Sequence, residues 1–154
     1  MQPSKSVRER REASIWTRIH PIFAIGQLGA FAVSVVLLAL YFLHLASFAT
    51  VYLSVLIKIA FMIGAVITGS LWEKDMYGAW WFAHEFFIED VMTLNVFLLH
   101  AAFLVTVFAW SSNMPAILSL LGVAYGAYFL NVIQYILAHQ GMKDLDDPKV
   151  ANAA

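Results

Sequence analysis

Two adjacent carboxylic acids, Glu89 and Asp90, are the residues best suited to do chemistry, because they lie near the start of a long apolar segment. A charged side chain at the centre of a bilayer costs about 2.5–3.5 kcal/mol on insertion scales, so such residues usually face a bundle interior or a cavity. Adjacent carboxyl groups repel when poorly solvated, so one of them can stay protonated. A protonated carboxyl can act as general acid while its ionised neighbour handles water. The alternative is a structural ion pair with Lys74 or Arg18.

Polar side chains on the other apolar segments fall at a comparable depth. Glu89 and Asp90 lie roughly 6 to 8 Å into their segment, and Asn131 and Gln134 lie roughly 6 to 11 Å from the end of the last one, counting about 1.5 Å per helical residue. Asn131 and Gln134 also share a helix face. Their alternative role is to hydrogen-bond neighbouring helices. If these groups face inward, they predict a polar chamber near the cytoplasmic surface.

Lys58 and His100 form a second, deeper feature, roughly 12 and 15 Å from the outer ends of consecutive antiparallel helices. This placement allows the two side chains to be neighbours. Lys58 could instead extend its long stem toward the outer interface. His100 could make an interhelical hydrogen bond, or its neutral imidazole could bind a metal such as the magnesium of a chlorin. No intrinsic metal site is expected, because the histidines lack the spacing that would pair them on facing helices.

Composition defines the class of protein that positions these groups. The 154 residues are 62% hydrophobic and 12% charged, which is far from the balance of a soluble domain and indicates an integral membrane protein. The mean hydropathy of +0.77 agrees. Cysteine is absent, which excludes disulfides, thiolate metal sites and cysteine nucleophiles. The net charge of −1 gives no reason to expect a nucleic-acid partner.

The apolar residues fall in four stretches, each long enough for the about 20 residues of helix that cross a hydrocarbon core. The predicted spans are 21–46, 50–71, 85–110 and 114–138. We therefore expect an all-α, four-helix transmembrane bundle over residues 21–138. Residues 1–20 would form an N-terminal arm at the membrane surface, and residues 139–154 a C-terminal tail.

Basic residues predict the topology, because Lys and Arg concentrate in cytoplasmic segments. They precede the first span, separate the second from the third and follow the fourth: Lys5, Arg8, Arg10, Arg11, Arg18, Lys74, Lys143 and Lys149. The other two connections carry none, so both termini should be cytoplasmic. The arm from Ser6 to Glu12 has helical charge spacing, and it is either a helix on the membrane surface or a solvated topology signal.

A set of residues spread over about 11–138 matches the pattern of one enzyme family. The set is Arg11, Ala13, Ser14, Trp16, Thr17, Lys58, Trp72-Glu73-Lys74, Gly78, Phe82-Ala83, Phe86-Phe87, Glu89-Asp90 and His100. In these residues the chain resembles the bacteriochlorophyllide vinyl hydratases. His84-Glu85 departs from the pattern, where proline and a small apolar residue are expected.

The resemblance implies a hydro-lyase that adds water to the 3-vinyl group of chlorophyllide a or a bacteriochlorophyllide, giving a 1-hydroxyethyl group in bacteriochlorophyll synthesis. No redox cofactor would be required, and the substrate would be a magnesium chlorin or bacteriochlorin. Our hypothesis makes Glu89, Asp90 and Glu73 the catalytic residues. Substrate binding would fall to Lys58, His100, Asn131, Gln134, Lys74 and Trp72, with His100 as the candidate ligand of the substrate magnesium.

The resemblance also implies the surroundings of the protein. Its partners would be the pigment and membrane lipid, in the cytoplasmic or intracytoplasmic inner membrane of a phototrophic bacterium. Self-association, or association with pigment-synthesis or photosynthetic complexes, is compatible with such a protein. Two other functions stay open: a non-catalytic pigment-binding or assembly subunit of a photosynthetic complex, and a small proton-coupled transporter. Conversion of a vinyl pigment by the purified chain would separate the enzyme from both.

Overall fold

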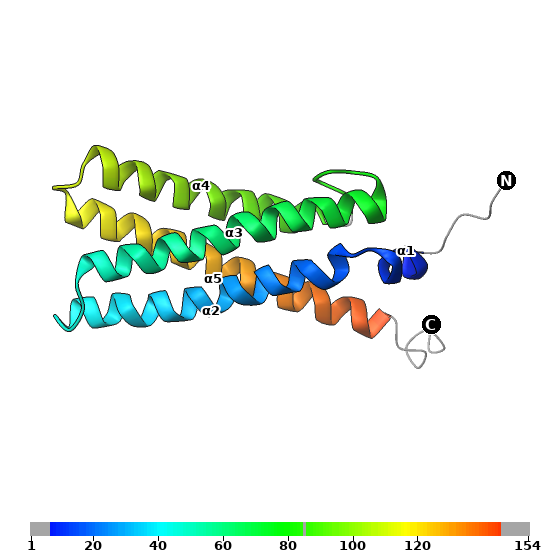
Figure 1. Cartoon of the computed structure of the whole chain (residues 1–154), viewed down its shortest axis with the longest axis horizontal. Helices are drawn as coiled ribbons and strands as arrows, with labels where there is room; N and C mark the ends of the chain where they lie inside the picture. Colours follow the sequence, from blue (N-terminus) through cyan, green and yellow to red (C-terminus); the bar gives the residue numbers. More distant parts are fainter. Residues whose placement is uncertain (1–6, 85, 146–154) are drawn as a thin grey trace. The chain divides into compact units, whose positions relative to one another are not determined.

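The computed structural model describes residues 7–84 and 86–145, and every regular element in them is helical (Figure 1). The helices are α1 Val7–Ala13, α2 Trp16–Phe42, α3 Phe48–Tyr77, α4 Phe87–Ala109 and α5 Met114–Leu145. The last four are long and apolar enough to cross a membrane. The all-α prediction with four spanning helices is therefore confirmed. The chain divides into two compact units, with the boundary between Ala83 and His84.

In the first unit, α2 and α3 run antiparallel and are joined by a short turn, and α1 lies beside the far end of α3 (Figure 1). Two glycines allow the helices to approach closely. A Cβ atom at Gly26 would collide with the Phe61 ring on α3, and one at Gly64 would collide with the Phe23 ring on α2. Small residues opposite large ones are a common basis of helix packing in membranes, where van der Waals contact replaces the hydrophobic driving force.

The helices of this unit are displaced from the predicted spans. Helix α2 begins at Trp16 and ends at Phe42, rather than covering 21–46, and α3 runs to Tyr77, six residues beyond the predicted end. Hydropathy marks where apolar residues stop, but a helix continues while its backbone hydrogen bonds can form. Helix α3 stops at Gly78, which adopts the left-handed conformation with φ of 78° that favours glycine.

This extension corrects the expected position of Trp72, Glu73 and Lys74. The predicted spans end at 71 and resume at 85, which leaves these residues in a connection, but they lie in the last turns of α3. Helix α1 confirms the helical reading of the arm, and it contacts α3. The Arg10 guanidinium donates to the Met76 carbonyl at 2.9 Å, and Ser14 Oγ donates to Asp75 Oδ2 at 2.8 Å.

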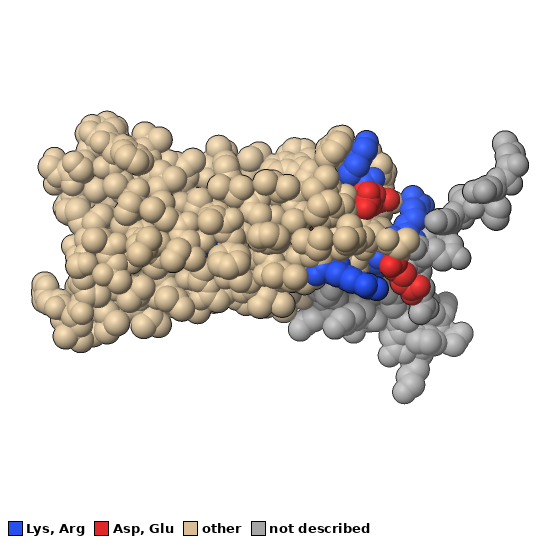
Figure 2. All heavy atoms as spheres, viewed as in Figure 1, with Lys and Arg blue, Asp and Glu red and all other residues tan. Residues whose placement is uncertain are grey.

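Charged side chains of the first unit gather where α1, the start of α2 and the end of α3 lie (Figure 2). The turn between α2 and α3, residues 43–47, carries no Lys, Arg, Asp or Glu. Lys58 is the exception within the helices, and it is fully buried. The charge asymmetry along this helix pair is that of a membrane hairpin with one basic end.

In the second unit, α4 and α5 are antiparallel neighbours with a short connection at residues 110–113 (Figure 1). Helix α4 begins at Phe87, two residues after the predicted start, and α5 continues to Leu145, seven residues beyond 138. Asn113 Oδ1 accepts a hydrogen bond from the Ala116 N–H at 3.2 Å, which caps the start of α5. Two contacts fix the register of the pair: Thr93 with Asn131 and His100 with Tyr125.

Candidate functional site

Glu89 and Asp90 lie in the first turn of α4, and both are half-buried. Because the helix begins at Phe87, they are about 3 to 5 Å along its axis, shallower than expected. The first turn of a helix presents unpaired backbone N–H groups and the positive end of the helix dipole, which favours carboxylates there. Glu85, which precedes them in the sequence, lies outside the described residues. The acid pair therefore sits where protons and water can reach it from the helix end.

Asn131 and Gln134 face this part of α4. Asn131 Nδ2 donates to Thr93 Oγ1 at 3.4 Å, and Thr93 is one turn along α4 from the acid pair. Moving one turn along both antiparallel helices from this contact brings Gln134 level with Asp90. The Gln134 side-chain oxygen Oε1 is buried and has no hydrogen-bond partner among the described residues. An unpaired buried acceptor costs about 1–3 kcal/mol, so this oxygen is suited to receive a hydrogen from a water or a ligand.

His100 is almost completely buried in the same unit, at 1% exposure. Its Nδ1 lies 2.8 Å from the Val96 carbonyl oxygen. A carbonyl only accepts, so Nδ1 carries the hydrogen, and in a neutral imidazole the lone pair is then on Nε2. The ring also stacks on Tyr125, with centroids 6.2 Å apart. His100 is thus held in one orientation, which a metal ligand requires.

Lys58 lies in the first unit, and its exposed fraction is 0%. Its Nζ is 5.9 Å from the centre of the Phe31 ring on α2, within cation–π range. The alternative that its stem extends to the outer interface is therefore wrong. One turn before Lys58, Ser54 Oγ is 2.7 Å from Ser34 Oγ of α2, also buried. The sequence analysis did not single out these serines. The four-residue step from Ser54 to Lys58 on α3 was the available signal, because it places those two residues on one face of the helix. Lys58 and His100 belong to different units, and the proposal that they are neighbours stays a prediction.

The residues Trp72, Glu73 and Lys74 hold the first unit together. Trp72 Nε1 donates to Thr17 Oγ1 of α2 at 3.0 Å. Glu73 is 5% exposed, and its Oε2 accepts the Ala83 backbone N–H at 3.3 Å. The Lys74 ammonium donates to the Gly78 carbonyl at 3.0 Å. These bonds attach all three side chains to neighbouring groups of the first unit, and their expected roles in catalysis and substrate binding stay predictions.

Among the candidates, the second unit contains Glu89, Asp90, Asn131, Gln134 and His100, and the first contains Lys58 and the three residues at the end of α3. Within residues 7–84 and 86–145, no group of three or more His, Asp or Glu side chains is arranged to hold a metal ion. The arrangement that can do chemistry is the acid pair with the buried amide oxygen level with it. That combination can transfer a proton and hold a water molecule.

The fold and the site define a class: an all-helical membrane protein with an acid pair in the first turn of one spanning helix and a buried amide beside it. A sequence model of the 2-vinyl bacteriochlorophyllide hydratase family matches residues 4–140. The chain belongs to this family, and the enzyme class that the family name defines is hydro-lyase.

Two relatives agree with the family match. The chain is similar to a 2-vinyl bacteriochlorophyllide hydratase of Rhodobacter capsulatus, with 35% identity over 84% of this chain and 75% of the relative. It is also similar to a protein of the same name from Cereibacter sphaeroides, with 33% identity over 84% of this chain and 80% of the relative. No solved structure matches the chain. The resemblance inferred from the sequence motifs is therefore confirmed.

Proposed function

We propose that this protein adds water to the ring vinyl group of a chlorophyllide or bacteriochlorophyllide, the group numbered 2 in the names of its relatives. The observation that carries the proposal is the family match over residues 4–140, which includes every candidate residue of both units. The product would be a 1-hydroxyethyl substituent on a macrocycle used for bacteriochlorophyll synthesis. The geometry of the second unit supports acid–base chemistry of this kind.

The acid pair would move the protons. One carboxyl of Glu89 and Asp90 donates its proton to the terminal vinyl carbon, which becomes a methyl group. The positive charge then lies on the inner carbon and is delocalised into the macrocycle. Water adds to that carbon, and the second carboxylate takes the proton that the water loses. One molecule of water is consumed, no electrons are exchanged, and we propose that the reaction requires no redox cofactor.

Gln134 would hold the water. Its Oε1 is buried without a partner and lies level with Asp90 in the helix register. A water molecule bound there donates one hydrogen to the amide and keeps its lone pairs for the cation. Asn131, which is tied to Thr93, would keep the facing helix in position. Holding the reacting water in place removes much of the entropic cost of a bimolecular addition.

Two buried residues would bind the substrate. The orientation of His100, set by its bond to Val96, suits the imidazole to bind the magnesium of the substrate through Nε2. The buried Lys58 ammonium would interact with a negatively charged or carbonyl group of the macrocycle. Glu73 was also a candidate for catalysis, but its bond to Ala83 supports a positioning role, and we propose the proton transfers for Glu89 and Asp90.

The test is to incubate the purified chain, in lipid nanodiscs, with vinyl chlorophyllide in water enriched in oxygen-18. We expect the pigment to gain the mass of one labelled water molecule and to lose its vinyl absorption. Pigment that binds without conversion would instead favour the pigment-binding or assembly subunit. Proton movement in sealed vesicles without conversion would favour the transporter.

We also propose that both termini face the cytoplasm of a phototrophic bacterium and that the protein lies in its inner membrane. The basic residues at the α1 end of the first unit support this orientation. Because the chain has no cysteine, single cysteines introduced at the exposed positions Ser47 and Ala13 can be labelled by a reagent that does not cross the membrane. We expect Ser47→Cys to be labelled from the outside and Ala13→Cys to be labelled only after permeabilisation.

A further inference from the structure

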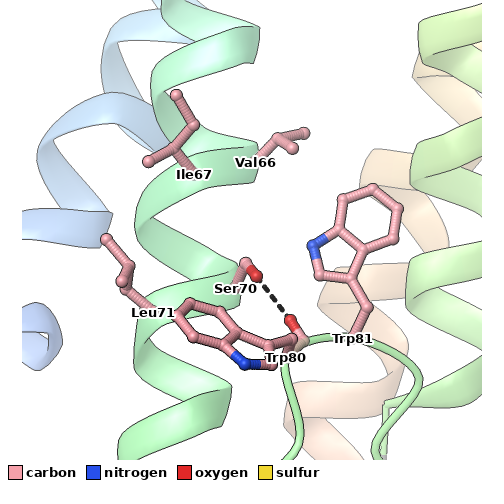
Figure 3. A pocket seen from close by; sticks show the side chains of 6 residues that line it. All are labelled: Val66, Ile67, Ser70, Leu71, Trp80 and Trp81. Atoms are coloured by element: carbon pink, nitrogen blue, oxygen red, sulfur yellow. Dashed lines mark hydrogen bonds between the residues drawn. The ribbon is translucent and has the colours of Figure 1, made fainter.

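The first unit contains an apolar slot near the end of α3, and none of the residues that line it has a role in the proposed function. It has a volume of about 260 Å³ and lies between α3 and the segment after Gly78. Its lining is Val66, Ile67, Ser70, Leu71, Trp80 and Trp81 (Figure 3). The two tryptophans come from the loop after Gly78, and the other four lining residues come from α3 (Figure 3). Ile67 and Trp80 are 53% and 58% exposed, so the slot opens toward the surroundings of the helix, which in a membrane are lipid.

The loop that carries the indoles is fixed by three polar side chains from consecutive turns of α3. Ser70 Oγ donates to the Trp80 carbonyl, and Glu73 accepts the Ala83 N–H, so both ends of the Trp80–Ala83 segment are bonded to the helix. Lys74 Nζ lies 5.3 Å from the centre of the Trp80 ring. The slot is therefore formed before any ligand arrives, which lowers the cost of binding.

The backbone within this segment is strained. Phe82 has a φ of 58°, in the left-handed region that a bulky side chain rarely adopts. Its ring packs edge-to-face against Trp81, with centroids 5.6 Å apart. Such a conformation persists only where surrounding contacts enforce it, and it is concentrated at ligand clamps and active sites. Trp81 and Phe82 therefore form an aromatic pair in the part of the loop that lines the slot.

We propose that this slot binds one apolar edge of the chlorin substrate, with Trp80 and Trp81 as its contact surface. This inference rests on the proposed function for the identity of the ligand. A volume of about 260 Å³ is below the about 300–1,000 Å³ of sites that enclose a whole drug-sized ligand, so it fits part of a macrocycle. Flat aromatic side chains pack well against a flat conjugated ring. Ser70 uses its hydroxyl within the loop, which leaves an apolar lining suited to the ring edge.

The depth of the slot suits a pigment that arrives from the membrane. Helix α3 has 30 residues and is about 45 Å long, so a hydrocarbon core of about 30 Å centred on it would begin about 7.5 Å from its end. Val66 and Leu71 lie roughly 9 to 17 Å from that end, which would place the slot just inside the apolar layer, where the ring of a pigment dissolved in lipid can reach it. The slot would then receive the ring directly from lipid, while Glu73 and Lys74 act as positioning residues.

The experiment measures binding separately from turnover. The probe is chlorophyllide a with its vinyl group reduced to ethyl, which cannot be hydrated, titrated into the protein in nanodiscs. We expect Trp81→Leu to raise the Kd about tenfold and Trp80→Leu to raise it by a smaller factor. Trp81→Phe, which keeps a flat ring, should recover most of the affinity. Trp110→Leu is the matched control, because Trp110 is also exposed at a helix end but lies in the other unit.

The outcomes of this experiment distinguish failure of the inference from failure of the proposed function. If both leucine variants retain native helix content and bind within twofold of the wild type, the slot does not contact the ring. If phospholipid with brominated chains quenches Trp80 and Trp81 equally with and without saturating pigment, a lipid chain occupies the slot instead. A protein that binds the ethyl pigment through Trp81 but never hydrates the vinyl pigment would refute the proposed function and leave this site intact. If both leucine variants hydrate the vinyl pigment at the wild-type rate and with unchanged KM, the proposed function stands and the slot is not part of the substrate site.

Discussion

The two units treat their buried polar groups differently. In the first unit, the buried side chains Ser34, Ser54, Thr68 and Glu73 all have partners within the hairpin or its loop. In the second, the buried oxygen of Gln134 has none among the described residues, and it lies level with an acid pair. Polar groups with partners stabilise a structure, whereas an unsatisfied one costs stability unless a ligand completes it. Under the proposed function, the proton transfers belong to the second unit, whereas the first contributes a closely packed helix pair and substrate contacts at Lys58 and the slot.

The largest expected effect comes from removing the acids of the second unit. Glu89→Gln and Asp90→Asn should each lower the hydration rate about 100-fold to 10,000-fold, because a positioned proton donor or acceptor is lost. The measurement is initial-rate conversion of vinyl pigment in nanodiscs, with binding of the ethyl analogue recorded in parallel. Glu12→Gln on the exposed side of α1 is the control. Full activity in either variant would remove that residue from the mechanism.

The scaffold role of the first unit is tested at its closest helix contact. Gly64→Ala places a Cβ against the Phe23 ring and should destabilise the protein by about 1–3 kcal/mol, as overpacking does. Gly29→Ala is the matched control, since no atom lies within 4 Å of its added Cβ, and it should be neutral or slightly stabilising. Denaturant unfolding in mild detergent measures both. Equal stabilities would show that the helices are not closely packed at Gly64.

Gln134→Leu should change the hydration rate and the free energy of unfolding in different ways. Hydration should fall about tenfold, because the water loses one directed hydrogen bond worth about 1.4 kcal/mol. Stability should stay constant or rise by up to about 1 kcal/mol, because an unpaired buried acceptor is removed. Asn131→Leu, which breaks the bond to Thr93, is the comparison and should lower stability. A large loss of stability in Gln134→Leu would mean that its amide has a structural partner.

His100→Phe examines whether the second unit also recognises the metal of the substrate. The wild type should prefer the magnesium pigment over its metal-free form by about tenfold in KM, and the variant should lose that preference. Phenylalanine keeps the flat ring that stacks on Tyr125 but cannot bind a metal. Steady-state kinetics with both pigments gives the ratio. An unchanged ratio in the variant would leave His100 a packing role, through its bond to Val96 and its stacking on Tyr125.

The smallest expected effect concerns the attachment of the arm. Ser14→Ala removes one hydrogen bond to Asp75 and should cost about 0.5–1.5 kcal/mol, with little change in kcat. Thermal unfolding followed by circular dichroism measures the loss. Ser112→Ala, in the exposed turn between α4 and α5, is the control. A large loss of activity in Ser14→Ala would place the arm in the chemistry and break the division between the units.

The sequence by itself determined the class of the protein and its main candidates. Four apolar stretches require helices in a membrane, because every backbone polar group must be satisfied within its own segment. Motifs containing Trp72-Glu73-Lys74 and Glu89-Asp90 indicated the family, and the family match confirms it. The polar stripe of Asn131 and Gln134 was also visible as a helical spacing. Which of these residues do chemistry was not visible, because residue type does not show which hydrogen bonds a side chain makes.

Tertiary structure decided where the helices end and what each polar side chain contacts. Helix α3 continues to Tyr77 because of backbone hydrogen bonds that hydropathy does not measure. Glu73 therefore lies in a helix, outside the predicted span, and its carboxylate accepts a hydrogen bond from the Ala83 N–H. The start of α4 at Phe87 made Glu89 and Asp90 first-turn residues. The unpaired oxygen of Gln134 depends on how α5 packs, and the slot beside Trp81 depends on how the segment after Gly78 folds back along α3. Local patterns specify helices, but only packing sets which polar groups meet a partner and which remain for a substrate.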